Sequence, residues 1–378
     1  MNIAIDARSV TWAKGSGIGT YTSNIINEIQ KISVDYNYLL FWCDKDYKNI
    51  SNNRIKNMIL SKKHTNFFDK IYIPNSLKNN NIDLYHIPQN GIGLNESIDC
   101  KKIVTVHDLI PYVLPETVGP GYLKNFLESM PKIIELCDGI LTVSEYSKRD
   151  ILKFFPAFPE EKIYVTPLAA NEKYKLLNKN KCKKRIQNLY KFDTDYILYI
   201  GGFSSRKNVK MIIDSLKESL SSLKSEVKLL IAGSLKDEGL NLKKYCSDIN
   251  MDDNVLFIGY ADEDLLPILY NGCTAFIYPS LYEGFGLPPL EAMHCGAPVI
   301  TSNTTSIPEV VSDCGLLIDP TSQSQLSESI VKLLNDIELQ QQYQLLGLMR
   351  SKHFSWHNTA LNTIKVYTEV LNSPKDPE

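Results

Sequence analysis

Features that would define several protein classes are absent from this sequence. No run of about eighteen apolar residues occurs, so no transmembrane helix is expected. The eight cysteines are scattered between Cys43 and Cys314 and none forms a Cys-x-x-Cys pair, so neither a zinc site nor a disulfide framework is indicated. The net charge is only −2, which gives no overall attraction to nucleic acid or to an anionic membrane. Residues 1–6 lack the basic and long apolar segments of a signal peptide, and a cytoplasmic protein is expected.

What the sequence contains is a repeated alternation of short apolar strands and helical segments. Strands are expected near residues 2–7, 38–42, 84–87, 102–106, 139–143 and 163–165, and again near 196–200, 227–232, 255–258, 275–278, 298–300 and 315–318. Such alternation predicts parallel sheets covered by helices, an α/β fold. The length of 378 residues is enough for two domains of this kind.

A polar segment rich in Lys and Asn separates the two series of strands and is the best candidate for a linker. We therefore predict an N-terminal Rossmann-like domain over residues 1–170, a linker over 171–192, a second Rossmann-like domain over 193–350 and a C-terminal helix and tail over 351–378. Ligands of open parallel sheets bind at the carboxyl ends of the strands. A binding cleft is therefore expected between the two domains.

The most informative run is Tyr-Pro-Ser-Leu-Tyr-Glu-Gly-Phe-Gly-Leu-Pro-Pro-Leu-Glu-Ala-Met-His at residues 278–294. It places Glu283 at a glycine turn and Glu291 in the helix that follows, with seven residues between them. Gly284 and Gly286 let the backbone approach a ligand closely. The first N–H groups of the helix favour an anion, while carboxylates accept hydrogen bonds from hydroxyl groups. A nucleotide sugar combines both features, although glutamates that are solvated or cap the helix remain the plain alternative.

This string resembles the signature of family 4 of the retaining glycosyltransferases with the GT-B fold, and the resemblance extends from residue 2 to about residue 368. It implies two Rossmann-like domains facing across a cleft, with the C-terminal helix returning to the N-terminal domain. It also implies transfer of a hexose from a nucleotide diphosphate sugar to a glycan or lipid-linked acceptor, with retention of the anomeric configuration. No metal cofactor is implied, and the nucleotide sugar acts as a co-substrate.

Two candidate sites lie in the N-terminal half. His107 and Asp108 open the block His-Asp-Leu-Ile-Pro at the end of an expected strand, and this block is similar to a subgroup that often transfers mannose. The resemblance implies that His107 lies beside the donor sugar and that Asp108 orients the imidazole or the loop, although a lone histidine is usually structural. Gly17 and Gly19 belong to a Gly-x-Gly-x-Gly loop whose N–H groups would approach the donor diphosphate. A plain glycine-rich turn is the alternative.

Arg206 and Lys207 follow a strand and are expected at the positive end of the next helix. Cations are unfavourable there, so two of them indicate a polyanionic ligand such as a diphosphate. The alternative is a solvated surface pair. The resemblance agrees, because related enzymes use a Lys here and many use a nearby Arg. The commonest family pattern has Arg where this chain has Gly202, and Arg206 is expected to supply that charge.

The resemblance gives the remaining roles. Glu283 would hold hydroxyls of the transferred sugar, Glu291 would bind the ribose, and the main chain near Tyr260 would touch the base. The expected catalytic residues are His107, Arg206, Lys207 and Glu283, and the expected donor-binding residues are Gly17, Gly19, Asp108, Gly202, Tyr260, Gly284, Phe285, Gly286, Leu287 and Glu291.

Metal binding has weak support in the sequence. Asp-x-Asp patterns occur at residues 44–46, 193–195 and 262–264 and could hold Mg²⁺ beside a diphosphate. Their surroundings are typical of turns and helix starts, where Asp is common. Since two cations are already present, metal-independent transfer is expected.

Other functions fit less well. A nicotinamide oxidoreductase needs a Gly-x-Gly-x-x-Gly spacing that this chain lacks, and nucleic-acid binding lacks a basic and aromatic stripe. A sugar-nucleotide epimerase or a non-catalytic sugar-nucleotide-binding protein remains open. GDP-mannose is the favoured donor, with UDP-hexoses possible.

The acceptor is expected along residues 49–70 and 112–126. Residues 62–70, which contain Lys and Phe, could bring the protein to the inner face of a membrane, although an ordinary exposed loop is the alternative.

Overall fold

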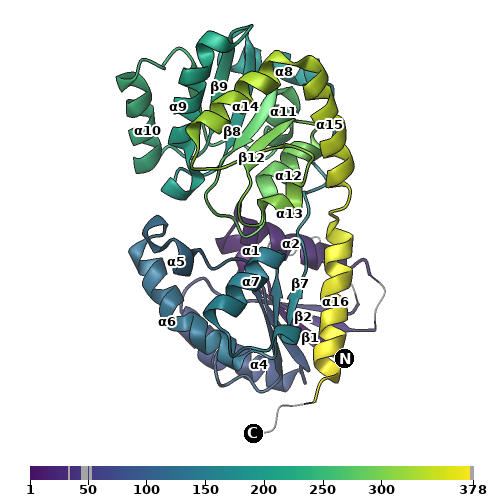
Figure 1. Ribbon diagram of the computed structural model, residues 1–378. Coiled ribbons are helices and arrows are strands. Elements are labelled where there is room, and N and C mark those ends of the chain that lie inside the picture. Colours follow the sequence, from purple (N-terminus) through teal and green to yellow (C-terminus); the bar gives the residue numbers. More distant parts are fainter. Residues whose placement is uncertain (33–34, 44–49, 51–52, 375–378) are drawn as a thin grey trace. The chain divides into compact units, whose positions relative to one another are not determined.

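The computed structural model describes residues 1–32, 35–43, 50 and 53–374 (Figure 1). The chain forms two compact units. Unit 1 contains residues 1–168 together with the segment that begins at Ser355, and unit 2 contains residues 169–354. The chain thus leaves unit 1, builds the whole of unit 2 and then returns to unit 1.

Unit 1 is built on a parallel sheet that has seven strands in its described part, in the order β3-β2-β1-β4-β5-β6-β7. The strands are β1 (Asn2–Asp6), β2 (Asn37–Trp42), β3 (Ile55–Ile59), β4 (Leu84–Ile87), β5 (Lys101–Val106), β6 (Gly139–Thr142) and β7 (Ile163–Val165). The central strands β1, β4 and β6 are almost wholly buried. Helices cover both faces of such a sheet, which is why these strands are continuous apolar runs.

The helical segments of unit 1 connect these strands and supply its last element. They are α1 (Ser9–Trp12), α2 (Gly17–Ile29), α3 (Thr65–Phe67), η1 (Phe68–Tyr72), α4 (Ile73–Asn79), α5 (Ile110–Val113), η2 (Pro115–Thr117), α6 (Pro120–Leu136), α7 (Glu145–Phe154), η3 (Glu160–Lys162) and α16 (Trp356–Asn372). The C-terminal helix α16 packs against α2, as expected from the family resemblance (Figure 1).

Unit 2 is a second parallel sheet, with six described strands in the order β10-β9-β8-β11-β12-β13. These are β8 (Asp195–Ile200), β9 (Val227–Ala232), β10 (Val255–Gly259), β11 (Ala275–Tyr278), β12 (Val299–Ser302) and β13 (Leu316–Ile318). The helical segments are α8 (Lys179–Tyr190), η4 (Ser205–Lys207), α9 (Val209–Ser219), η5 (Leu220–Ser222), α10 (Asp237–Asp248), α11 (Leu266–Gly272), α12 (Leu287–His294), α13 (Ile307–Val311), α14 (Gln323–Asn335) and α15 (Ile337–Ser351).

The strand order reverses beside the first strand of each sheet, at β1/β4 in unit 1 and at β8/β11 in unit 2. In open α/β sheets such a switch point leaves a crevice at the carboxyl ends of the strands. Arg206 follows β8 and Glu283 follows β11, the two strands at the switch point of unit 2, while His107 follows β5, one strand beyond the switch point of unit 1. The two-sheet fold class predicted from the strand–helix alternation is confirmed.

Several elements differ from the expectation. The edge strand β3 was not predicted, because it is only partly buried and its apolar pattern is weak. The helices α10 and α15 were also not predicted, since both are largely polar and few of their residues are buried. Helix α12 begins at Leu287, before the two prolines, because proline at the first positions of a helix is well tolerated.

Gly19 allows α1 to pack tightly against α2. A Cβ atom at this position would lie 2.3 Å from the carbonyl oxygen of Ala13, whereas real Cβ atoms do not approach so closely. The main-chain amide of Gly19 donates a capping hydrogen bond to the Ser16 hydroxyl oxygen, 3.3 Å away. Gly19 therefore has a structural role at the start of α2, whatever ligand the preceding loop binds.

We expect Gly19→Ala to lower the free energy of unfolding by about 2 kcal/mol, because the added methyl group has to displace the backbone of α1. Urea denaturation followed by circular dichroism measures this change. The matched control is Gly121→Ala in α6, where no heavy atom lies within 4 Å of the new Cβ and the variant should be as stable as the parent or slightly more so. Equal stability of the two variants would contradict the packing role of Gly19.

Candidate active site

Arg206 and Lys207 lie in the short 3-10 turn η4, which connects the end of β8 to α9. They lie directly before the N-terminal end of α9, which begins at Val209. Asn208 makes the junction with a left-handed backbone, φ 58°, and its side-chain amide donates to the carbonyl of Pro320 at 2.7 Å. Both cations are about 14% exposed and point toward the loop that follows β11.

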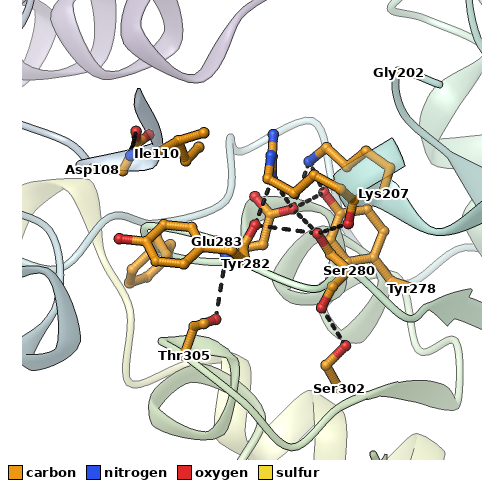
Figure 2. Close-up of polar contacts among 12 residues, drawn as sticks. Asp108, Ile110, Gly202, Lys207, Tyr278, Ser280, Tyr282, Glu283, Ser302 and Thr305 are labelled. Atoms are coloured by element: carbon orange, nitrogen blue, oxygen red, sulfur yellow. Dashed lines mark hydrogen bonds and ion pairs between the residues drawn. The ribbon is translucent and has the colours of Figure 1, made fainter. Parts of the chain in front are cut away.

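One oxygen of Glu283 is the centre of this cluster. Its Oε1 accepts hydrogen bonds from Lys207 Nζ at 2.6 Å, Arg206 Nη1 at 2.8 Å, the Ser280 hydroxyl at 2.6 Å and the Tyr278 hydroxyl at 3.0 Å. Figure 2 shows Lys207, Tyr278 and Ser280 gathered around Glu283. The structure therefore brings three of the four expected catalytic residues together within unit 2.

The charges of this cluster do not cancel. Burial alone would raise the pKa of Glu283, but Lys207 and Arg206 outweigh that effect and lower the pKa to about 2. Glu283 is thus ionised at neutral pH, and the formal charges of Arg206, Lys207 and Glu283 add to +1. A partly buried site with surplus positive charge at the carboxyl end of a strand favours an anionic ligand.

Tyr278 was not predicted as a site residue. Its hydroxyl also contacts Lys207 Nζ, whose ammonium lies 4.9 Å from the centre of the tyrosine ring. The ring is buried and stacks on Tyr199, with 6.0 Å between the ring centres. In the sequence, a tyrosine at the end of an apolar strand is indistinguishable from an ordinary core residue. Only the tertiary structure reveals that its hydroxyl contacts Lys207 and Glu283.

The loop after β12 holds the main chain of Glu283. The amide of Glu283 donates to the Thr305 hydroxyl at 3.2 Å (Figure 2), and the Ser306 hydroxyl lies 2.8 Å from the carbonyl oxygens of both Glu283 and Phe285. Thr305 has a left-handed backbone with φ 58°, which is strained for a β-branched residue. These contacts fix the Glu283 turn from the neighbouring strand.

The expected glycine turn connects Glu283 to α12. Gly286 has φ 121°, which disfavours a side chain, and a Cβ there would lie 2.9 Å from Ile307 Cδ1. Gly284 and Phe285 are buried, and Phe285 packs edge-on against Phe354 with ring centres 5.7 Å apart. Leu287 is the first residue of α12. The turn thus presents main-chain groups next to the carboxylate of Glu283.

Glu291 has a different set of neighbours. Its Oε2 accepts a hydrogen bond from the Tyr270 hydroxyl at 3.1 Å, and Tyr174 is a second hydrogen-bonding neighbour. Burial raises the pKa of Glu291 to about 7, despite these bonds and the charge of Lys173. Glu283 and Glu291 therefore differ in protonation: the first is a fixed anion, and the second changes its charge near neutral pH.

In unit 1, His107 follows β5 and is buried. Its Nε2 lies 2.8 Å from the carbonyl oxygen of Pro88, and its main-chain amide donates to Asn90 Oδ1 at 2.9 Å. Burial lowers its pKa to about 4, so the ring is neutral at physiological pH. Since the carbonyl can only accept, Nε2 carries the proton and Nδ1 is left as a hydrogen-bond acceptor.

The other expected residues have more varied surroundings. Asp108 Oδ1 accepts a hydrogen bond from the main-chain amide of Ile110, the first residue of α5, at 3.1 Å. Gly17 is exposed in the first turn of α2. Gly202 is exposed, and its carbonyl accepts a hydrogen bond from the Tyr199 hydroxyl at 2.6 Å. Tyr260 follows β10 and is 68% exposed.

Two of the three Asp-x-Asp patterns lie within the described residues. Residues 44–46 lie outside the described residues. Asp195 forms an ion pair with Lys183, and residues 262–264 precede α11 in a turn. Within the part of the chain that the structure describes, no group of three or more His, Cys, Asp or Glu side chains is arranged to hold a metal ion.

Two parallel α/β units, one with a basic and acidic cluster after a strand end, are the arrangement expected of a GT-B glycosyltransferase. Comparison with known families agrees. Residues 15–173 match the model described as "Glycosyltransferase Family 4", and residues 180–344 match "Glycosyl transferases group 1".

The relatives point the same way. The chain is 32% identical over 267 residues to "O-antigen chain mannosyltransferase B" of Escherichia coli, covering 71% of this chain and 70% of that protein. It is 28% identical to "Serotype-specific mannosyltransferase WbdA" of Escherichia coli over 74% of this chain but only 35% of the relative. The structure of HepE from Anabaena in complex with UDP-glucose matches with a TM-score of 0.78 and 16% identity, covering 98% of this chain and 100% of that chain.

The chain therefore belongs to family 4 of the glycosyltransferases, in group 1, and has the GT-B fold. It is an enzyme of the hexosyltransferase type. None of the helices that the structure describes is long and apolar enough to cross a membrane.

We expect the free energy of unfolding to fall as the pH rises from 4.5 to about 7, because folded Glu291 keeps a proton that the unfolded chain releases in this window. Glu291 is half-buried, and solvent screening should keep the loss to about 2 kcal/mol or less. Denaturant titrations at several pH values measure it against Glu291→Gln, which cannot ionise and should lack this component. Identical pH profiles for the two proteins would contradict the raised pKa.

Proposed function

We propose that this chain transfers a hexose, with mannose from GDP-mannose favoured over UDP-hexoses, to a glycan or lipid-linked acceptor. Transfer would proceed with retention of configuration and without a metal ion. The observation that carries the proposal is the Arg206–Lys207–Glu283 cluster with its surplus positive charge. The preference for mannose is supported by the relatives, two of which are called mannosyltransferases.

Arg206 and Lys207 would bind the donor diphosphate. Each already contacts Glu283, so their side chains are held in place before the ligand arrives. Negative charge develops on the leaving diphosphate during transfer, and fixed cations stabilise that charge without further rearrangement. This arrangement supports a reaction in which the protein itself supplies the positive charge.

Glu283 would accept hydrogen bonds from hydroxyls of the transferred sugar. Its low pKa, about 2, keeps it an acceptor over the whole physiological range. The main-chain amides of Gly284, Phe285 and Gly286 would assist, since these residues form the turn directly after it. No general base is assigned, because in same-face transfer the leaving phosphate takes the proton of the acceptor.

His107 would hold the donor sugar through its Nδ1 atom. The proton on Nε2 is committed to the Pro88 carbonyl, so Nδ1 can accept a hydrogen bond from a sugar hydroxyl. The neutral state of the ring fits this role, since a protonated ring would have no acceptor. Asp108 would contribute by fixing the start of α5 next to the histidine.

The remaining proposed contacts with the sugar nucleotide come from Glu291 and from exposed main chain. Glu291 would bind the ribose hydroxyls once its carboxyl group is ionised. The exposed main chain at Gly17, Gly202 and Tyr260 would approach the diphosphate and the base.

A peripheral membrane contact is proposed for the segment around α3 and η1. Ile59, Phe67 and Ile71 are each about half exposed, at 48%, 48% and 51%, and Lys62 and Lys70 lie among them in the sequence. Exposed apolar residues flanked by lysines suit an anionic lipid surface. Such a contact would place the enzyme at the inner face of a membrane, near a lipid-linked acceptor.

We expect Lys207→Ala and Glu283→Ala each to reduce turnover of the sugar nucleotide at least about a hundredfold, which corresponds to roughly 2.7 kcal/mol of barrier. A coupled assay for release of the nucleoside diphosphate measures it. Lys210→Ala is the matched control, because Lys210 is an exposed lysine three residues away whose partner is Asp214. If both site variants turn over normally while folded, the assigned roles are wrong.

We expect GDP-mannose to raise the melting temperature more than UDP-glucose does at equal concentration, because a ligand at a hundred times its Kd adds about 2.7 kcal/mol of stability. The shift should be larger at pH 8 than at pH 5.5, since ribose binding requires the ionised form of Glu291. Glu291→Gln should lose that pH dependence. A larger shift with UDP-glucose would overturn the preference for GDP-mannose but leave the reaction class intact.

A further inference from the structure

A series of buried polar side chains leads from the C-terminal helix α16 to the surroundings of His107. The Tyr367 hydroxyl on α16 lies 2.6 Å from Nδ1 of His86, and Nε2 of His86 lies 2.8 Å from the Thr105 hydroxyl. The Thr105 hydroxyl in turn lies 3.1 Å from the hydroxyl of Tyr21. All four side chains are fully buried, so each depends on its protein neighbours for its hydrogen bonds.

His86 suits this series because it stays neutral. Burial, and then the electrostatic effect of His107, lowers the pKa of His86 to about 3. A neutral imidazole has one donor and one acceptor nitrogen, and the hydroxyls of Tyr367 and Thr105 can fill either role. Both ring nitrogens therefore have hydrogen-bond partners in either tautomer, and the series of hydrogen bonds does not depend on which nitrogen carries the proton.

Tyr21, on α2, is where the series meets His107. The two rings are edge to face, with centres 5.0 Å apart and an angle of 84° between their planes. The same tyrosine ring contacts Trp356, the first residue of α16, at 6.3 Å. Tyr21 is therefore held by α16 in two ways: through its ring by Trp356, and through its hydroxyl by the series that ends at Tyr367.

The hydrogen bonds of His107 hold one ring nitrogen and the main-chain amide. The Pro88 carbonyl binds Nε2, and Asn90 binds the main-chain amide. The imidazole ring turns about its Cβ–Cγ bond, and one hydrogen bond at Nε2 limits this rotation only to the broad range of angles that a hydrogen bond tolerates. A ring packed edge to face against it removes this freedom and so fixes the direction of Nδ1.

We propose that Tyr21 is a positioning residue for His107, and that α16 holds Tyr21 in place through Tyr367 and Trp356. The inference rests on the proposed role of His107 in holding the donor sugar. It explains why the last helix of the chain returns to unit 1: residues 1–168 alone lack the α16 partners of Tyr21 and His86.

The first test follows His107 itself by NMR in the full-length protein with labelled histidine. Tyr21→Leu should raise the pKa of the His107 imidazole by at least about half a unit and broaden its ring signals, since the ring gains water and freedom. Tyr21→Phe keeps the ring and should largely restore the parent signals. Tyr196→Leu is the matched control, because Tyr196 is a fully buried tyrosine in β8 of unit 2 and its hydroxyl donates to the carbonyl of Leu269. Unchanged His107 signals in Tyr21→Leu would overturn the proposal.

The second test is a double-mutant cycle with GDP-mannose as the probe, measured as release of GDP in the presence of methyl α-mannoside. We expect Tyr21→Leu to lower kcat about tenfold with less than about a threefold change in KM, and to add nothing when His107→Ala is already present. Tyr367→Phe should show a smaller loss of the same kind. Thermal unfolding confirms that each variant is folded at the assay temperature.

The outcomes separate the two proposals. If His107→Ala turns over like the parent, the proposed role of His107 fails, and the positioning of a catalytic histidine fails with it. If His107→Ala is slow but the Tyr21→Leu loss is fully additive, Tyr21 acts independently of His107. The positioning inference is then wrong, while the proposed function stands.

Discussion

The Glu283 carboxylate is the interaction on which the site of unit 2 depends. One of its oxygens is shared by two cations, a tyrosine and a serine, and these come from the ends of two neighbouring strands, β8 and β11. A half-buried anion of this kind is stable only because the cations compensate its loss of hydration. In return, the carboxylate keeps Arg206 and Lys207 in a defined place, where their surplus charge can attract a diphosphate.

The main chain of Glu283 and the residue His107 are instead held by neutral partners. Thr305 and Ser306 bind the main chain of Glu283, and Pro88 and Asn90 bind His107. Hydroxyls and carbonyls fix direction without changing the net charge of the site. In each unit, charged or titratable side chains are thus combined with uncharged supporting groups, which is the kind of arrangement that preorganised electrostatic stabilisation requires.

The sequence predicted the fold class and the three residues of the Glu283 cluster because each depends on local patterns. Buried parallel strands are continuous apolar runs, and the Glu-Gly-Phe-Gly-Leu-Pro-Pro-Leu-Glu string is distinctive. The elements that were not predicted are β3, α10 and α15. Their residues are largely polar or only partly buried, so their sequences show no clear hydrophobic periodicity. The supporting residues Tyr278 and Tyr21 were not predicted for another reason. Their partners Lys207 and Thr105 are distant in sequence, and an isolated hydroxyl in an apolar segment carries no signal of its neighbour.

The amino-acid sequence by itself determined the two series of strands, the family and the identity of the charged residues, because apolar periodicity and residue chemistry are local properties. Only the tertiary structure decided which charges meet. It joined Arg206 and Lys207 to Glu283 across 76 or 77 residues, gave Glu291 a carboxyl group that titrates near neutral pH, and brought Tyr367 to His86 across 281 residues. Burial and contact set these properties, and both arise only when strand ends and helices pack together.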